Sequence, residues 1–262
     1  MRSQKAITNQ FQKYVELKAS IPSEGEWIRD YGYYLLKNPK NDSQWFGLVV
    51  GPDDSLYSGA IMTVRITFPS DFPFSPPKIE NLMPFKRQFN ANLWSVDTVQ
   101  SLMCSNGEYK PFYGLICMDI LNTPHSKMET NVYGELVEVY DKGKEQYTPI
   151  INIGSIMMSM RSNILNGETR LSYVDDIGLK YITLRFLAYG VFNLDFHLPD
   201  EDKAYVKNEW RAVFKTLFNM FAPHYQNVVK ELTSGEKYSS EVTELTALHD
   251  RFVEMYNPRL IS

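Results

Sequence analysis

The sequence predicts an α+β fold, in which a four-stranded antiparallel meander sheet has one N-terminal helix and several C-terminal helices. Three observations support this prediction. An apolar stripe at helical spacing opens the chain, apolar and polar residues alternate from 62 to 68, and helical spacing returns after Pro149. Because short turns separate the strand-like segments, neighbouring strands are expected to pair in chain order.

Each expected element of the first half follows from its residue pattern. Ile7, Phe11 and Tyr14 share one helical face, so a helix is expected over about residues 4–18. It ends before Pro22, because proline disfavours helical geometry in the preceding residue. Aromatic and β-branched runs bounded by turn-forming residues then predict strands at 27–36, 45–50, 62–68 and 78–82.

The second half is expected to hold two loops and several helices. The loops cover residues 85–116 and 122–146, where no clear period is present. Apolar stripes at helical spacing predict helices at about 149–164, 200–221 and 241–256, with Pro223 ending or kinking the second of these.

Composition limits the class of protein. The chain has 262 residues, a net charge of −4 and only two cysteines, Cys104 and Cys117. This charge argues against a nucleic-acid binder, and two cysteines provide neither a disulfide framework nor a zinc site. No apolar run reaches membrane-spanning length, and no secretory signal is seen at the start. We expect a soluble protein of a reducing compartment, cytoplasmic or nuclear, with no membrane or nucleic-acid partner.

Residue chemistry alone leaves the role of Cys117 open. It lies in an apolar segment, where a buried structural thiol is the ordinary interpretation, whereas Cys104 lies in a polar turn. A cysteine hydrolase would need a histidine base, but none of the four histidines is spaced for that role. No metal-ligand spacing or phosphate-binding loop is present in the sequence either.

Five segments, read together, change this interpretation. They are Trp45–Phe46, the Gly-Pro turn at 51–59, the proline-rich run at 68–78, the segment Gly-Leu-Ile-Cys-Met-Asp-Ile-Leu at 114–121, and Tyr-Thr-Pro at 147–149. In this order the sequence resembles the ubiquitin-conjugating enzymes and their UBC fold. The resemblance covers about residues 3–170 and implies that Cys117 carries ubiquitin or a ubiquitin-like protein as a thioester.

The resemblance also implies an oxyanion donor. Asn92 stands where the family has the asparagine of its His-Pro-Asn tripeptide, although Asn90 and Ala91 replace the histidine and proline that brace the loop. The segment from Asn92 to Cys117 is longer than in the family, and Asn106 within it is the competing candidate. We expect Asn92 to stabilise the oxyanion formed when a lysine attacks the thioester.

Further roles follow from the same resemblance. Ser172, Asp175 and Asp176 are candidates for the group that helps deprotonate the incoming lysine. A ligase-docking face is expected from the three residues Phe74, Pro149 and Ile150. The expected partners are the modifier, its activating enzyme, a ubiquitin ligase and a protein substrate, and no cofactor is expected.

The sequence also predicts the domain boundaries and leaves two rival functions open. We expect a UBC core at residues 1–178 and a helical C-terminal region at 179–262, whose aromatic stripe must pack on the core or on a partner. The rival interpretations are a catalytically inactive UBC-like scaffold that binds ubiquitin or a ligase, and an unrelated thiol enzyme with a histidine near Cys117.

Overall fold

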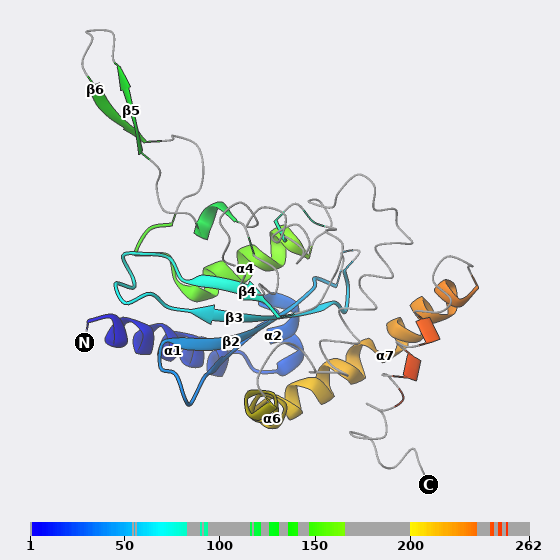
Figure 1. Cartoon of the computed structure of the whole chain (residues 1–262). Helices are drawn as coiled ribbons and strands as arrows, with labels where there is room; N and C mark the ends of the chain where they lie inside the picture. The colour runs from blue at the N-terminus through cyan, green and yellow to red at the C-terminus, as the bar shows by residue number, and fades with distance from the viewer. Residues whose placement is uncertain are drawn as a thin grey trace.

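The computed structural model describes residues 2–53, 55, 57–82, 90, 92–93, 116, 118–121, 126–130, 136–140, 147–165, 200–234, 242–243, 246–247 and 250. Its ordered centre is a four-stranded sheet with helices on both sides (Figure 1). The helices are α1 (Arg2–Ser20), α2 (Glu24–Asp30), α4 (Ile153–Ile164), α6 (Asp200–Glu209) and α7 (Arg211–Thr233), and a short 3-10 turn, η1, covers Asp119–Leu121.

The sheet is the predicted antiparallel meander. Its strands β1 (Tyr33–Lys37), β2 (Gln44–Val50), β3 (Ile61–Thr67) and β4 (Lys78–Asn81) lie in the order β1-β2-β3-β4. Trp45 of β2 is opposite Lys37 of β1 and Ile66 of β3, which sets the register. Because side chains alternate along a strand, one face carries Trp45, Gly47 and Val49, and the other carries Phe46, Leu48 and Val50.

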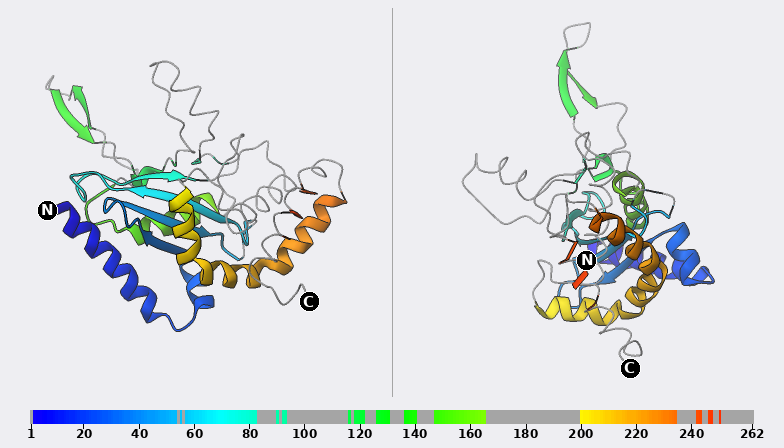
Figure 2. Two further views of the ribbon diagram at one scale, coloured as in Figure 1. Left: turned by 60° about the horizontal axis from the view of Figure 1, so that its bottom comes forward. Right: turned by 90° about the vertical axis from the view of Figure 1, so that its right-hand side faces the viewer.

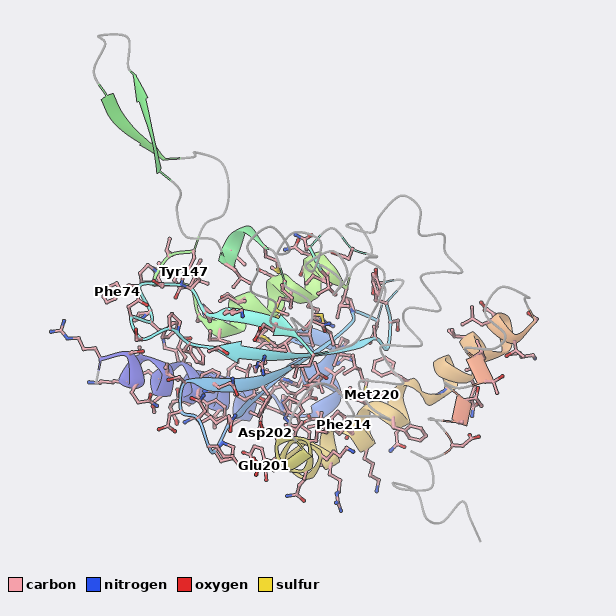
Figure 3. The ribbon with its side chains drawn as sticks, in the orientation of Figure 1. Phe74, Tyr147, Glu201, Asp202, Phe214 and Met220 are labelled. Carbon is pink, nitrogen blue, oxygen red and sulfur yellow. The ribbon has the colours of Figure 1, made fainter. Side chains whose placement is uncertain are left out.

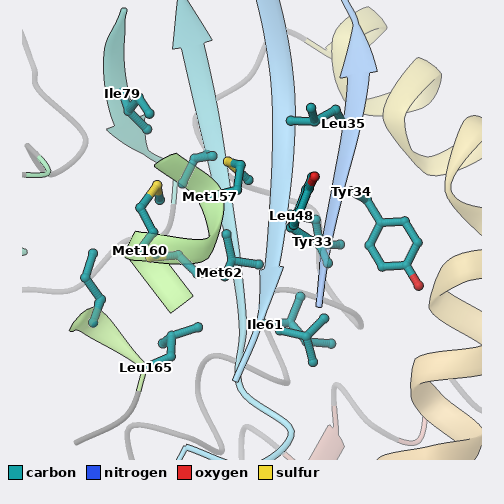
Figure 4. Close-up of a cluster of buried hydrophobic side chains, with 14 of the residues drawn as sticks. Tyr33, Tyr34, Leu35, Leu48, Ile61, Met62, Ile79, Met157, Met160 and Leu165 are labelled. Carbon is teal, nitrogen blue, oxygen red and sulfur yellow. The ribbon is translucent and has the colours of Figure 1, made fainter. Parts of the chain in front are cut away.

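Helices α1 and α4 cover the first of these faces. Phe11 of α1 meets the ring of Trp45 at a centroid distance of 5.2 Å, and Tyr14 lies 5.8 Å from Tyr33. The α4 helix approaches closely at Gly47, where an added Cβ would lie 2.8 Å from Cε of Met157. Figure 4 shows Met157 and Met160 beside the strands, next to Met62 and Ile79. The asparagine cap of α4, Asn152, accepts a hydrogen bond from Ser155 N.

Helices α6 and α7 lie on the opposite side of the sheet (Figure 2). Lys40, in the β1–β2 turn, pairs with Glu201 at 2.6 Å. An added Cβ on Gly59 would lie 3.0 Å from Cδ1 of Phe221, so α7 touches the turn before β3. The buried stripe of the two helices belongs to the same apolar cluster as the sheet: Val206, Trp210, Phe214, Leu217, Phe221. The predicted aromatic stripe therefore packs on the chain's own core.

The C-terminal helices differ from the prediction in two ways. The expected single helix over 200–221 is two helices, separated at Trp210. Of the two expected effects of Pro223, an end or a kink, the end is wrong, because α7 continues to Thr233. Pro223 is exposed, and Phe221, Val228 and Leu232 are buried on either side of it. Packing of these flanking residues offsets the hydrogen bond that proline removes. The expected helix at 241–256 lies largely outside the described residues.

The expected strand at 27–36 is wrong in its first half. Residues Glu24–Asp30 form α2, because Ser23 caps its N-terminus by accepting from Glu26 N at 3.2 Å, and two glutamates lie in its first turn. Trp27 is apolar and aromatic like a strand residue, but it is buried beneath α1 and donates from Nε1 to Tyr33 O at 2.6 Å. Aromatic content alone did not distinguish a buried helix from a strand.

The expected loop at 122–146 is also partly wrong. It contains the antiparallel strands β5 (Ser126–Thr130) and β6 (Leu136–Tyr140), in which Met128 pairs with Glu138. The hairpin projects away from the body of the molecule in all the views of Figures 1 and 2. Charged residues and two glycines across residues 122–146 favoured a loop, although Leu136–Tyr140 is mostly apolar. Across the described helices, no segment combines the length and the hydropathy of a transmembrane span.

Candidate functional site

The candidate site is built around the completely buried asparagine Asn90. Its Nδ2 donates to the carbonyl oxygen of Ile164 at 3.1 Å, and its Oδ1 accepts from the backbone N–H of Asn92 at 2.8 Å. Ile164 is the last residue of α4, where helix carbonyls have no partner within the helix. One side chain thus ties the Asn92 loop to the end of α4.

A second connection joins this loop to the segment that precedes Cys117. Leu93 forms an antiparallel bridge with Ile116, and Asn90 also bridges Leu93. Both Leu93 and Ile116 are buried, and so is Met118. The loop that carries Asn92 is therefore held against the residue immediately before Cys117, although many residues separate the two in sequence.

The position of α4 itself depends on a buried arginine. Arg161 donates from Nε to Val50 O at 3.0 Å and from Nη2 to Ile28 O at 3.1 Å. It fits because Gly32 has no side chain: an added Cβ there would lie 2.6 Å from the arginine Nε. Gly32 also has a φ of 59°, which L-residues rarely adopt. Arg161 thereby fixes the helix whose end receives Asn90.

The predicted site residues are described unequally. Asn92 is described and is partly exposed. Five other predicted or competing residues and the second cysteine lie outside the described residues: Cys117, Asn106, Ser172, Asp175, Asp176, Cys104. Among the residues that are described, no group of metal-ligating side chains is found.

The predicted docking residues gather at the end of the sheet where the proline-rich connector turns. Phe74 is 71% exposed and Ile150 is 84% exposed, and Pro149 is exposed as well. Figure 3 places Phe74 beside Tyr147, whose hydroxyl donates to Pro73 O at 3.0 Å. Burial raises the pKa of Tyr147 to about 12, with Asp71 contributing, so this hydroxyl stays a donor at neutral pH. The connector is thus fastened to the turn that carries Pro149.

Sequence reasoning did not assign a role to Asn90. It treated the residue as a departure from the family tripeptide, whereas the structure shows it as the buried link between the loop and α4. The available signal was chemical: an asparagine amide has both a donor and an acceptor, so it can join two backbone groups at once.

Comparisons with known proteins identify the family. The sequence model of the family "Ubiquitin-conjugating enzyme" matches residues 28–183, which is more than half of the chain. The chain therefore belongs to the ubiquitin-conjugating enzyme family. Its α+β architecture, with an N-terminal helix, a meander sheet and C-terminal helices, is the UBC fold that the resemblance implied.

Individual relatives are distant. Ubiquitin-conjugating enzyme E2 7 of Arabidopsis thaliana is 27% identical over 127 residues, which are 48% of this chain and 59% of that protein. Ubiquitin-conjugating enzyme E2 13 of the same plant is 26% identical over the same shares. The match thus spans about three fifths of the length of these curated relatives.

Two solved structures are also similar to the chain. Human ubiquitin-conjugating enzyme E2 G1 is 22% identical with a TM-score of 0.38, covering 62% of this chain and 95% of that one. A Plasmodium vivax ubiquitin-conjugating enzyme E2 is 18% identical with a TM-score of 0.36, covering 60% and 96%. The family assignment rests on the sequence model rather than on these superpositions.

Proposed function

We propose that this chain is an active ubiquitin-conjugating enzyme, which carries ubiquitin or a ubiquitin-like protein on Cys117 and transfers it to a substrate lysine. The observation that carries the proposal is the Leu93–Ile116 bridge. Asn92 precedes Leu93 and Cys117 follows Ile116, so in an antiparallel pair the bridge supports an asparagine amide acting beside the cysteine.

The chemistry has two steps. In the first, the Cys117 sulfur attacks the carbonyl carbon of the modifier's thioester on the activating enzyme; a new C–S bond forms and the old one breaks. In the second, a lysine amine attacks the same carbon, a C–N bond forms, the bond to Cys117 breaks and the nitrogen loses a proton. Neither step needs a histidine base at Cys117, because the donor is already a thioester and a thiolate is a strong nucleophile.

Asn92 is proposed to stabilise the second step. The tetrahedral intermediate places negative charge on the former carbonyl oxygen, and a fixed amide N–H₂ can donate to it. Ser172, Asp175 and Asp176 remain the proposed candidates for the group that accepts or orients the lysine proton.

The exposed apolar end at Phe74, Pro149 and Ile150 is proposed to bind a ubiquitin ligase. Phe74 and Ile150 both expose most of their apolar surface to water. Covering that surface with a partner removes it from water, which favours binding. The same proposal includes three partners, namely an activating enzyme, a ligase and a protein substrate. It also includes a cytoplasmic or nuclear location.

The test is formation of an adduct on a denaturing gel. With activating enzyme, ATP and ubiquitin, the wild type is expected to form a band that reductant removes. Cys117→Ser is expected to form a reductant-resistant ester or no adduct, and Cys104→Ala is expected to form the thioester normally. A wild type that binds ubiquitin but never forms the adduct would support the scaffold role. If only Cys104→Ala abolished the adduct, Cys104 rather than Cys117 would be the nucleophile.

The same assay, with a ligase that discharges the wild type, tests the docking face. Phe74→Ala is expected to form the adduct and to slow ligase-stimulated discharge about tenfold or more, as a buried aromatic anchor does. Met220→Ala is the matched control, because Met220 is also an exposed apolar residue but lies on α7, far from Phe74 in Figure 3. Equal stimulation of both variants would remove Phe74 from the interface.

A further inference from the structure

Asn90 stands in the place of the histidine in the family tripeptide, and its contacts give it a specific role. We propose that Asn90 is a positioning residue for lysine transfer, which sets the orientation of Asn92 by holding its backbone to the end of α4. This inference rests on the proposed function, since it concerns the step in which Asn92 is proposed to act.

The two ends of one planar amide are engaged at once. Oδ1 accepts from Asn92 N at 2.8 Å while Nδ2 donates to Ile164 O at 3.1 Å. The amide group cannot rotate without losing one of these bonds, and complete burial leaves no water to replace the lost partner. The direction of the Asn92 backbone is therefore coupled to the position of α4.

The remaining contacts position Asn92 relative to the segment that contains Cys117. Asn90 also bridges Leu93, and Leu93 bridges Ile116. Asn90 thus accepts from the backbone N–H groups of Asn92 and of Leu93, while Leu93 pairs with Ile116, the residue before Cys117. The far anchor is rigid, because Arg161 ties α4 to α2 and β2.

Loss of the Asn90 hydrogen bonds is expected to affect transfer to lysine more than loading. During transfer to free lysine, the donors to the oxyanion come from this chain alone, so a shifted Asn92 slows the reaction directly. During loading, the activating enzyme also surrounds the reacting carbonyl. Removing the Asn90 amide is therefore expected to affect discharge much more than loading.

The experiment uses the full chain loaded with ubiquitin and measures single-turnover discharge to free lysine over a range of lysine concentrations. Asn90→Leu keeps the branched shape of the side chain but removes both hydrogen bonds. We expect its maximal discharge rate to fall about tenfold or more, with the lysine concentration for half-maximal rate unchanged. Loading is expected to stay within about twofold of wild type.

Asn38→Leu is the matched control. Asn38 is also a buried asparagine that joins two groups, donating to Gln44 Oε1 at 2.9 Å and accepting from Lys40 N at 3.0 Å, but it lies in the β1–β2 turn. Asn38→Leu removes the same kinds of hydrogen bond at a position away from the site, so this variant is expected to discharge ubiquitin at the wild-type rate. Equal slowing in both variants would show a general loss of stability and would overturn the proposal.

A double variant separates positioning from simple support of the fold. If Asn90 acts through Asn92, Asn90→Leu has no further effect on discharge once Asn92→Ala is present, because residues that act as one unit are non-additive. Multiplied losses in the double variant would overturn the proposal. Should Asn90→Leu fail to fold, Asn90→Ser carries the test, since its shorter hydroxyl side chain stays polar but does not bond to both backbone groups at once. Its discharge rate is expected to fall about tenfold or more with loading within about twofold of wild type, and a discharge rate equal to that of wild type would overturn the proposal.

These outcomes are distinct from failure of the proposed function. A wild-type chain that forms no Cys117 adduct would refute the activity itself, and this inference with it. A wild type that loads and discharges normally, with Asn90→Leu discharging at the same rate, would refute only the role of Asn90.

Discussion

At the scale of single residues, buried polar side chains fix the position of α4 relative to the neighbouring segments. Asn90 joins the loop to the C-terminus of the helix, and Arg161 joins its last turns to α2 and β2. Each donates to backbone carbonyl oxygens, and leaving a buried carbonyl without a partner commonly costs about 1–3 kcal/mol. Such contacts specify position because they work only in one geometry.

Gly32 gives a direct test of the arginine contact. Gly32→Ala is expected to lower the unfolding free energy by about 2 kcal/mol or more, because alanine is disfavoured by about 1–2 kcal/mol at positive φ and its Cβ would collide with Arg161 Nε. Urea unfolding measures this change.

Gly25 provides the control for this change within the same part of the chain. An added Cβ there has no atom within 4 Å, and Gly25 lies in α2. Gly25→Ala is therefore expected to stabilise the protein by up to about 1 kcal/mol. A Gly32→Ala protein as stable as wild type would contradict the role assigned to this glycine.

At the scale of elements, the pairing of β3 with β4 brings three charged groups together. Glu80 is opposite Arg65 in register, and Arg65 Nε and Nη2 both lie 3.0 Å from Glu80 Oε2. Lys78 Nζ lies 2.8 Å from the other carboxylate oxygen. Burial by itself raises the pKa of Glu80, but the hydrogen bonds and charges of Lys78 and Arg65 outweigh it, so the pKa is lowered.

The lowered pKa predicts how stability depends on pH. The unfolded chain binds the proton more readily, so the contribution of Glu80 is complete above the unfolded pKa of about 4.3 and is lost as pH falls through the folded pKa. Glu80→Gln is expected to cost about 1–2 kcal/mol at pH 7, and less as the pH drops below 4.

Urea unfolding of wild type and Glu80→Gln at pH 7, 5, 4 and 3 checks this prediction. Glu209→Gln is the control, because Glu209 is exposed on α6 and its loss is expected to change the unfolding free energy by less than about 0.5 kcal/mol. A difference between wild type and Glu80→Gln that is constant down to pH 3 would show that the lowered pKa contributes nothing.

At the scale of the whole molecule, α6 and α7 are part of one core with the sheet. Lys40 reaches Glu201 at the N-terminal end, and Phe221 packs on Gly59 near the middle of α7. Phe214 between them is completely buried in the common apolar cluster. The C-terminal helices and the sheet should therefore unfold in one transition.

Phe214→Ala tests this cooperative unit. Loss of a buried phenylalanine is expected to cost about 3–5 kcal/mol and to lower the midpoint by the same amount for probes on the sheet and on α7. Met220→Ala, six positions along the same helix and 38% exposed, is expected to cost less than about 1 kcal/mol. Hydrogen exchange of backbone amides in β2 and in α7, followed at increasing urea concentrations, provides the two probes. Separate transitions for the two signals would mean that the helices fold independently of the sheet.

Local pattern determined much of this protein. The stripe of Ile7 and Tyr14 predicted α1, the alternation around Val64 predicted β3, and short turns predicted the order of the strands. These features follow from the periods of helix and strand, which repeat within a few residues. The resemblance to the ubiquitin-conjugating enzymes, carried by five short segments in order, was confirmed by the family model.

Tertiary structure alone decided the remaining features. The aromatic run at Trp27 forms a helix because Ser23 caps it and α1 covers it, and the hairpin β5–β6 lies where charged residues and glycines favoured a loop. Asn90 bonds to Ile164, which is 74 residues away in the sequence, and Leu93 pairs with Ile116 across a long insertion. Such contacts have no period along the chain, because they arise only when packing brings distant backbone groups within hydrogen-bond reach.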